Sequence, residues 1–366
     1  FKQKTAYEIS LGLVGSEMCI RDRLVRSLEE GDVRSVVYNL GVASFESQFD
    51  RLRVLRWLEE ERRKWEDRLN HGWNPRLHDK WWDEIVPATD IYRASCGETP
   101  TDIVDMLNFL RAYSFKQFDY KFEIPNKKTT YHIINRYSRL LDTFNRLMIM
   151  VVGGVPCRNL LIDDLFQRKR KETESRGQGE RFRYVVTTLS YENRFRIFLK
   201  PFGEREAYAF SFAASESLSL LANMPENVFG DKLGAQVKGV EHVFEGIEGK
   251  TKLTFEKREK YFKRRELKSL ERLNRDVRRT LVKVRKFGSR SVLEDYCVLA
   301  IIYVNYFRRL GVLGRKTPAQ AIGIPYPYYV NMKGKKVFGH WVYFLPWVQH
   351  VMKNVSRVLL EALKRS

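Results

Sequence analysis

The spacing of hydrophobic positions divides the chain into a helical first part and a mixed part that begins near residue 151. Residues 51–69, RLRVLRWLEEERRKWEDRL, have apolar side chains at positions 52, 55 and 58 and dense charge between them. This spacing predicts an amphipathic helix with one solvated face. We expect residues 24–99 to form a basic helical N-terminal region.

Residues 100–150 have the apolar spacing of three successive helices, and the tight turn IPN separates the second helix from the third. Three helices with a short turn before the last are typical of a helix-turn-helix domain. In that domain the first residues of the last helix reach base edges. The residues predicted to contact DNA there are Lys127, Lys128, Thr129, Thr130, His132 and Arg136. The alternative is an ordinary three-helix packing unit with a solvated basic face.

Short continuous apolar runs appear after residue 151 and predict strands. They are LLID at 160–163, RYVVTTLS at 183–190, RFRIFLK at 194–200 and VFGD at 228–231. A helical pattern follows at about 204–221, and a second one comes after VFGD and ends at about 244. A charged crossover then leads to a third helical pattern at 266–289. This order predicts a mixed α/β domain, which we place at residues 155–312, followed by a C-terminal tail with a helix at 313–366.

The helix predicted at 266–289 has two distinct faces. Leu270, Leu273, Val277, Leu281 and Val284 have helical spacing and predict a buried side. Glu271, Asn274, Arg275 and Arg278 share another side, where one carboxylate is followed by amide and guanidinium groups. Guanidinium groups bind phosphate through two parallel hydrogen bonds, so this side suits a metal ligand beside a DNA backbone. An ordinary ion pair between Glu271 and Arg275 is the alternative.

Three carboxylates stand at positions where the fold would expose them at the edge of a sheet. Asp163 and Asp231 each close a short predicted strand, and Glu271 lies on the helix described above. Carboxylate oxygens are the ligands that Mg²⁺ and Mn²⁺ prefer. Two such ions can activate a nucleophile and stabilise a leaving oxygen in a displacement at phosphorus.

The segment LERLNRDVRRTLVKVRKFGS, with the order of the three acids, resembles the Glu-bearing helix of the DDE transposases and integrases of insertion sequences. KTPAQAIGI at 316–324 is similar to the Thr-Pro-Ala segment that commonly ends the catalytic core of that family. The resemblance covers roughly residues 100–324. At the first strand the usual Asp-Glu-Thr is replaced by Asp163, Asp164 and Leu165, so Asp164 is the alternative to Asp163 as the first ligand.

The resemblance implies an α/β fold with a ribonuclease-H-like mixed sheet and flanking helices, preceded by an all-α helix-turn-helix region. It implies metal-dependent DNA cleavage and strand transfer, with Asp163, Asp231 and Glu271 as catalytic metal ligands for two Mg²⁺ or Mn²⁺ ions. The implied partners are transposon ends and target DNA, on which the chain would assemble as a homo-oligomer. The implied location is the cytoplasm of a prokaryote, in association with the nucleoid. The alternative is an inactive or domesticated transposase that only binds DNA, and a ribonuclease-H-type nuclease is a third candidate.

Composition supports a polyanionic partner. The chain has 66 Lys and Arg residues against 45 Asp and Glu, a net charge of +21. Nucleic acid fits such a surface because neutralising phosphates releases condensed counterions. No apolar run reaches the ~20 residues of a membrane span. The cysteines are scattered without metal-ligand spacing, which favours a reducing compartment.

The first 23 residues show no pattern that predicts a helix or a strand. They lack helical or alternating periodicity, and, read back into codons, they resemble the flanking oligonucleotides of sequencing libraries. We therefore interpret residues 1–23 as translated adapter, with a native disordered terminus as the alternative.

Overall fold

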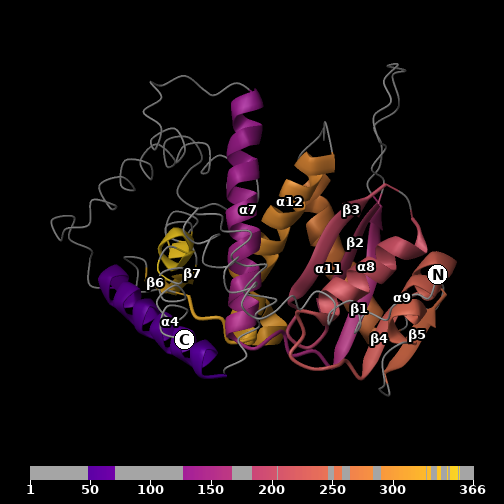
Figure 1. The fold of residues 1–366 in the computed structure, drawn as a ribbon, viewed down its shortest axis with the longest axis horizontal. Helices are drawn as coiled ribbons and strands as arrows, with labels where there is room; N and C mark the ends of the chain where they lie inside the picture. Colours follow the sequence, from indigo (N-terminus) through magenta and orange to yellow (C-terminus); the bar gives the residue numbers. More distant parts are fainter. Residues whose placement is uncertain are drawn as a thin grey trace, which may run out of the picture.

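The structure is a computed structural model. It describes residues 48–70, 127–166, 184–203, 205–245, 251–257, 264–282, 290–326, 328–330, 336–338, 344, 347–352 and 354. Residues 1–23, the expected adapter, lie outside this part of the chain. Figure 1 shows the sheet and its helices on one side, α7 and α12 in the middle, and α4 with the β6–β7 hairpin on the other side.

The largest sheet in the described part of the chain is mixed and has five strands. Its strands are β1 (Asn159–Phe166), β2 (Tyr184–Ser190), β3 (Arg196–Phe202), β4 (Asn227–Asp231) and β5 (Lys252–Glu256). They lie in the order β3-β2-β1-β4-β5. The first three pair antiparallel, and β4 and β5 continue the sheet parallel to β1. The expected mixed α/β architecture is therefore confirmed.

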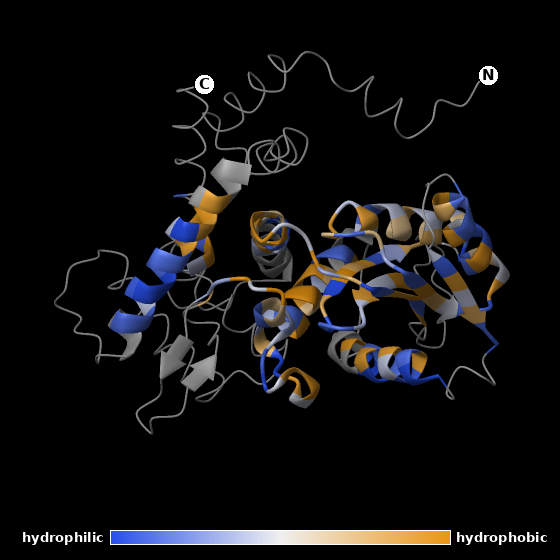
Figure 2. Cartoon of the chain, turned by 90° about the horizontal axis from the view of Figure 1, so that it is seen from below, coloured by the Kyte–Doolittle hydropathy of each residue, from blue (hydrophilic) through white to orange (hydrophobic). Residues whose placement is uncertain are grey.

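Helices lie on both sides of this sheet (Figure 2). They are α8 (Ala207–Leu218), α9 (Gly234–Phe244), α11 (Arg265–Val282) and α12 (Arg290–Ile302). Thr188 of β2 is hydrogen-bonded to Ser217 of α8, which places α8 on one side. The neighbouring Thr187 is bonded to Arg196, which reaches Asn274 of α11, so α11 covers the opposite side.

Two hydrophobic clusters fill these interfaces. The smaller cluster lies between the sheet and α11 and consists of Leu161, Leu189, Phe229, Leu267 and Leu270. The larger one joins the sheet to α7, α8 and α12. Since Leu161 and Phe229 both face α11, the side chains two residues further along β1 and β4 face α11 as well.

Helix α7 (Lys127–Val151) is 25 residues long. Its second half is buried in the larger cluster, and Ser138 donates a hydrogen bond to Asp295 of α12. Tyr306 likewise donates to Asn145 at 3.1 Å. The second half of α7 therefore shares the hydrophobic core of the sheet. The two helices expected before it lie outside the described residues, so the helix-turn-helix domain stays a prediction.

Helix α4 (Gln48–Asn70) contacts the C-terminal part of the chain. Its buried side is formed by Val54, Leu58 and Trp65, whereas Leu52, expected on the apolar face, is 42% exposed. Trp65 packs edge-on against Trp347, with ring centroids 5.4 Å apart. The two ends of the described chain are thus held together by aromatic packing.

Several elements differ from the sequence-based expectation. Strand β5 lies in the segment expected to be a charged crossover, and a hairpin of β6 (Tyr328–Val330) and β7 (Lys336–Phe338) lies in the expected C-terminal tail. Helix α12 is followed by a π-helical turn, η1 (Tyr303–Phe307), and by the 3-10 turn η2 (Gly311–Leu313). The Thr-Pro-Ala segment forms the start of α13 (Pro318–Ala321), where Thr317 and Gln320 make a capping box.

Candidate catalytic site

Asp163 and Asp231 occupy matching positions in neighbouring parallel strands. The sequence predicted that each acid closes its strand. Asp231 is the last residue of β4, but β1 continues past Asp163 to Phe166, because it stays paired with β2 there. The β1–β4 ladder pairs Asn159 with Asn227 and ends with the pair Leu161 and Phe229. Continued by two residues, the same register would place Asp163 beside Asp231. Both side chains are on the α11 side of the sheet, because they follow Leu161 and Phe229 by two residues.

The backbone pairing of β1 with β4 stops before these two acids, because the side chain of Gln236 takes the place of a backbone N–H donor. The amide Nε2 of Gln236, in α9, donates to the carbonyl oxygen of Ile162 at 2.9 Å. In a continued parallel ladder, that carbonyl would accept from the backbone N–H of Asp231. Gln236 is fully buried, and a Cβ on Gly230 would lie 2.0 Å from its Nε2. Gln236 and Gly230 together therefore end the pairing of β1 with β4 at the two carboxylates.

Asp163 is held by a helix residue and a buried cation. The amide Nδ2 of Asn274 donates to Asp163 Oδ2 at 2.8 Å. Arg196 of β3 donates through Nη2 to Asn274 Oδ1 at 3.1 Å, and through Nη1 to the hydroxyl of Thr187. Thr187 is the β2 residue directly opposite Asp163. Exposure is 7% for Asp163, 2% for Arg196 and 0% for Asn274.

The electrostatic environment of Asp163 disfavours its charged form. Burial, and then the negative charge of Asp164, raise its pKa to about 7, and the charge of Glu271 adds to the increase. A hydrogen bond from the Asp164 backbone and the charge of Arg278 act in the opposite direction. Glu271 and Arg278 of α11 are therefore close enough to Asp163 to influence its ionisation.

Glu271 is paired with Arg278 and not with Arg275, its partner in the alternative interpretation of the sequence. Arg278 Nη1 lies 2.9 Å from Glu271 Oε1. Arg275 is exposed. Asn274 cannot contact DNA in this arrangement, because it is fully buried and its amide is bonded to Asp163 and Arg196. Its assignment to DNA binding is therefore corrected to a contact inside the protein.

Asp164, the alternative first ligand, points to the other side of the sheet. Successive residues of a strand face opposite ways, and Asp164 is bound by Arg205, just before α8, at 2.6 Å. The carboxylate of Asp164 therefore lies away from α11 and from Glu271.

The predicted DNA contacts of α7 are only partly placed. Lys127, Lys128, Thr129, Thr130, His132 and Arg136 are in the first half of this helix. The positions of their side chains are outside the described part of the structure, so their role stays a prediction. Among the side chains of α11 that the structure describes, the exposed cations are Arg265, Lys268, Arg272 and Arg275, spaced at three and four residues along one side.

The three acids are chemically suited to a hard cation. Asp163, Asp231 and Glu271 offer only oxygen donors. The pKa of Asp163 is raised first by burial and then by the negative charge of Asp164 and Glu271, and a divalent ion would offset that charge. Within the described ranges, no three His, Cys, Asp or Glu side chains are already grouped closely enough to hold a metal ion. Glu271 would have to leave Arg278 to share an ion with Asp163.

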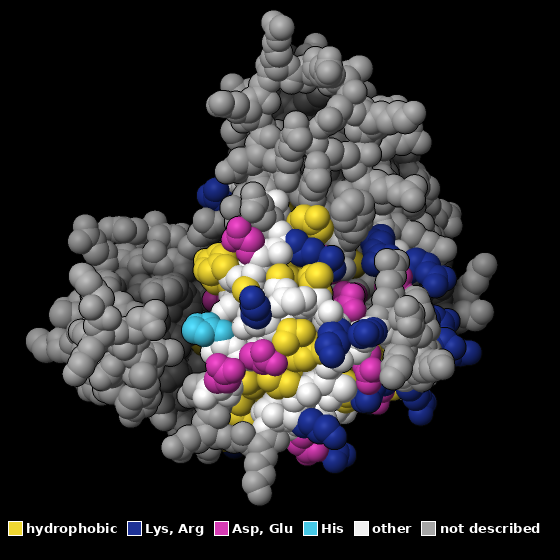
Figure 3. Space-filling view, turned by 90° about the vertical axis from the view of Figure 1, so that its right-hand side faces the viewer, with side chains coloured by type: hydrophobic (Ala, Val, Ile, Leu, Met, Phe, Trp, Pro, Cys, Tyr) yellow, Lys and Arg dark blue, Asp and Glu magenta, His cyan; other side chains and the backbone are white. Residues whose placement is uncertain are grey.

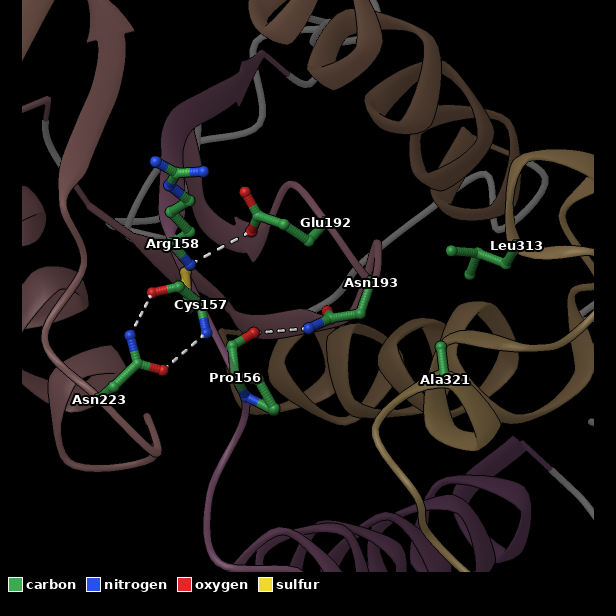
Figure 4. A pocket seen from close by; sticks show the side chains of 8 residues that line it. All are labelled: Pro156, Cys157, Arg158, Glu192, Asn193, Asn223, Leu313 and Ala321. Atoms are coloured by element: carbon green, nitrogen blue, oxygen red, sulfur yellow. Dashed lines mark hydrogen bonds between the residues drawn. The ribbon is translucent and has the colours of Figure 1, made fainter.

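A pocket of about 480 Å³ lies at the opposite end of β1 (Figure 4). Two of its polar side chains are hydrogen-bonded to backbone groups around the pocket. Asn223 accepts from the N–H of Cys157 and donates to its carbonyl, and Asn193 donates to the carbonyl of Pro156. Burial raises the pKa of the Cys157 thiol to about 12, so this thiol is not a reactive nucleophile. We therefore assign the pocket a structural role.

Charge on the face shown in Figure 3 is mixed. Lys and Arg side chains are interspersed there with Asp and Glu rather than gathered in one patch. The described exposed cations of α11, in contrast, are regularly spaced along one side of that helix. No helix in the described ranges is long and apolar enough to cross a bilayer.

The fold and site describe a mixed α/β protein whose five-stranded sheet carries two carboxylates in matching positions of adjacent parallel strands. No protein-family model and no curated protein matches the chain. Among solved structures, it is similar to a chain of the simian T-cell lymphotropic virus intasome in complex with the PP2A regulatory subunit B56 gamma, at 10% identity and a TM-score of 0.34. The match covers 47% of this chain and 58% of that chain. A TM-score this low carries no functional argument, so the proposal below depends on the residues themselves.

Proposed function

We propose that the chain is a DDE transposase that cuts and joins DNA strands in a metal-dependent reaction. The observation that carries the proposal is the placement of Asp163 and Asp231 on one side of two adjacent parallel strands, next to Glu271 of α11. The five-stranded mixed sheet with helices on both sides is compatible with the ribonuclease-H-like core that the sequence resemblance implies.

In this proposal Asp163, Asp231 and Glu271 hold two Mg²⁺ or Mn²⁺ ions. When bound, the ions supply activation of the attacking oxygen and stabilisation of the leaving oxygen. Asp163 is preferred to Asp164 because it faces α11, whereas Asp164 is bound to Arg205 on the other side of the sheet. Within the protein, Asn274 orients the carboxylate of Asp163, and Arg278 balances the charge of Glu271.

The proposed substrate is DNA, namely transposon ends and target. The net charge of +21 and the exposed cations of α11 support a phosphate-binding surface beside the carboxylates. We propose that Arg275 and Arg278 contact the DNA backbone near the site and that the first turns of α7 contact the ends. Assembly as a homo-oligomer on DNA, in the nucleoid of a prokaryote, belongs to the same proposal.

A DNA-binding protein without catalytic activity is the second candidate. The observation that favours it is that Glu271 is held by Arg278 and Asp163 by Asn274, with no preformed cation site in the described ranges. In that reading the acids balance the basic side chains of α11 and do not bind metal.

Nicking of supercoiled plasmid DNA in Mn²⁺ separates the two candidates. The transposase proposal predicts nicking that a chelator abolishes. It also predicts that three substitutions each reduce the nicking rate by at least about a hundredfold: Asp163→Asn, Asp231→Asn and Glu271→Gln. Each tenfold loss of rate corresponds to about 1.36 kcal/mol of lost transition-state stabilisation. Filter binding of the same plasmid should be retained by all three variants. Nicking by Glu271→Gln at the rate of the unchanged protein would leave the DNA-binding reading as the better one.

A further inference from the structure

A buried chain of polar side chains connects β2, β3 and α11 to the carboxylate of Asp163. The chain begins at the Thr187 hydroxyl, passes through the guanidinium of Arg196 and the amide of Asn274, and ends at Asp163 Oδ2. All four side chains are buried. They form one connected network that reaches the candidate site from inside the protein.

The guanidinium determines which way the Asn274 amide points. Arginine has only donors, so Arg196 Nη2 has to face the carbonyl oxygen of the amide. The amide nitrogen is then the group directed at Asp163, and it donates to one particular oxygen, Oδ2. Without Arg196, the amide could rotate and present its oxygen to the carboxylate, which would be repulsive.

Core packing alone does not account for these residues. A buried cation costs desolvation free energy, and apolar side chains of similar volume can fill such a space equally well or better. Here the backbone of Arg196 is also fixed, because its N–H donates to Asn305 Oδ1 at 2.9 Å and its carbonyl accepts from Asn305 Nδ2 at 2.9 Å. Asn305 is in the π-helical turn η1, a kind of distortion that is frequent at functional sites.

We propose that Arg196 and Asn274 are positioning residues for a metal-binding carboxylate. Asn274 holds the plane of the Asp163 carboxylate, and Arg196 acts through Asn274 without touching metal or DNA. This inference rests on the proposed function, because it assigns Asp163 to a divalent cation. Removal of such a supporting contact typically lowers metal affinity by about 10- to 100-fold.

Direct titration of Mn²⁺ into the full chain without DNA tests the proposal. Arg196→Met and Asn274→Leu should each weaken Mn²⁺ binding by at least about tenfold. Arg196→Lys keeps a donor toward Asn274 and should restore most of the affinity. The matched control is Arg63→Met, the same substitution at an exposed arginine of α4, which should bind Mn²⁺ as the unchanged protein does.

The double variant Arg196→Met/Asn274→Leu distinguishes positioning from packing. It replaces both partners of a buried hydrogen bond with apolar groups, so it should fold at least as stably as either single variant. Because Arg196 acts through Asn274, its loss of Mn²⁺ affinity should not exceed that of Asn274→Leu alone. Losses that multiply would overturn the proposed order of action. Unchanged Mn²⁺ affinity in the folded double variant would overturn the proposal itself.

Asp163→Asn separates a failure of this inference from a failure of the proposed function. If Asp163→Asn abolishes Mn²⁺ binding and the double variant does not weaken it, only the positioning role is wrong. If the unchanged protein does not bind Mn²⁺, or Asp163→Asn leaves binding intact, the metal assignment fails and the positioning role fails with it.

Discussion

Arg278 holds Glu271 at 2.9 Å across two turns of α11, and the charge of the same guanidinium partly offsets the increase in the pKa of Asp163 that burial and the neighbouring carboxylates cause. Arg278 therefore engages the Glu271 carboxylate that a divalent ion would need, and its charge also acts on Asp163. Metal binding and the Glu271–Arg278 ion pair are alternatives for the same carboxylate.

This competition predicts the effect of Arg278→Gln. Removing the positive charge should increase Mn²⁺ affinity at pH 8, since Glu271 becomes available and repulsion of the ion falls. Affinity for duplex DNA should decrease, because a proposed phosphate contact is lost. Titration calorimetry measures the first effect and fluorescence anisotropy the second. Weaker Mn²⁺ binding would show that Arg278 supports the site and does not compete with the ion.

The raised pKa of Asp163 predicts a stability change with pH. Its folded-state pKa of about 7 is above its ordinary value of 3.8, so the ionised form is disfavoured in the folded protein. The penalty is absent below about pH 4, grows as pH rises, and is complete above about pH 7. Asp163→Asn should therefore stabilise the protein at pH 8 by at least about 1 kcal/mol, and this gain should vanish at pH 4.

Urea unfolding in chelator at pH 4, 6 and 8 measures this difference directly. Addition of Mn²⁺ at pH 8 should stabilise the unchanged protein and not Asp163→Asn. A stability difference that is the same at all three pH values would contradict the raised pKa.

The contact between Gly230 and Gln236 predicts a specific coupling. A Cβ at position 230 would meet Gln236 Nε2 at 2.0 Å, so Gly230→Ala should destabilise the fold by about 1–3 kcal/mol. Adding Gln236→Ala should recover part of that loss, because the clashing side chain is gone. The readout is the free energy of unfolding in urea.

Gly239→Ala is the control for the comparison of Gly230→Ala with and without Gln236→Ala. A Cβ there would lie 2.2 Å from the backbone oxygen of Ala207, which Gln236→Ala cannot relieve. Gly239→Ala should therefore cost a similar amount in both backgrounds. Equal behaviour of the two alanine variants would argue against the role assigned to Gln236.

Trp65 should determine how firmly α4 is attached. Trp65 is 3% exposed and packs on Trp347 and His350, while Glu61 of the same helix binds His350 at 2.9 Å. Trp65→Ala removes most of this buried contact, a change of about 3–5 kcal/mol. Hydrogen exchange of α4 amides should accelerate strongly while that of β1 stays slow. Arg63→Ala, on the exposed side of α4, should leave both unchanged.

The strands that the sequence predicted are those with continuous apolar runs. Strands β1 to β4 and the helices α8, α9 and α11 lie where the pattern places them. Strand β5 was missed because KLTFE is short, lies at the edge of the sheet, and has no fully buried residue. Edge strands commonly carry charge, which hides the alternation that identifies a strand.

The candidate site was only partly predictable for a similar reason. Among the described side chains of α11, the fully buried ones are Leu267, Leu270, Asn274 and Val277, so Asn274 belongs to the apolar side although it is polar. Hydrophobic spacing assigns polar residues to the solvent side, so the sequence analysis placed Leu273, and not Asn274, on the buried side. Arg196 was missed in the same way. RFRIFLK has arginines at 194 and 196, and the second lies inside the apolar run from Phe195 to Leu199, which was an available signal.

Helix α7 has a mechanical consequence for the whole protein. Its 25 residues make an unbroken rod of about 37 Å, and its second half is locked into the core against α12. Because the second half of this helix is packed into the core, a force on its first turns would be passed to the core that the helix shares with the sheet.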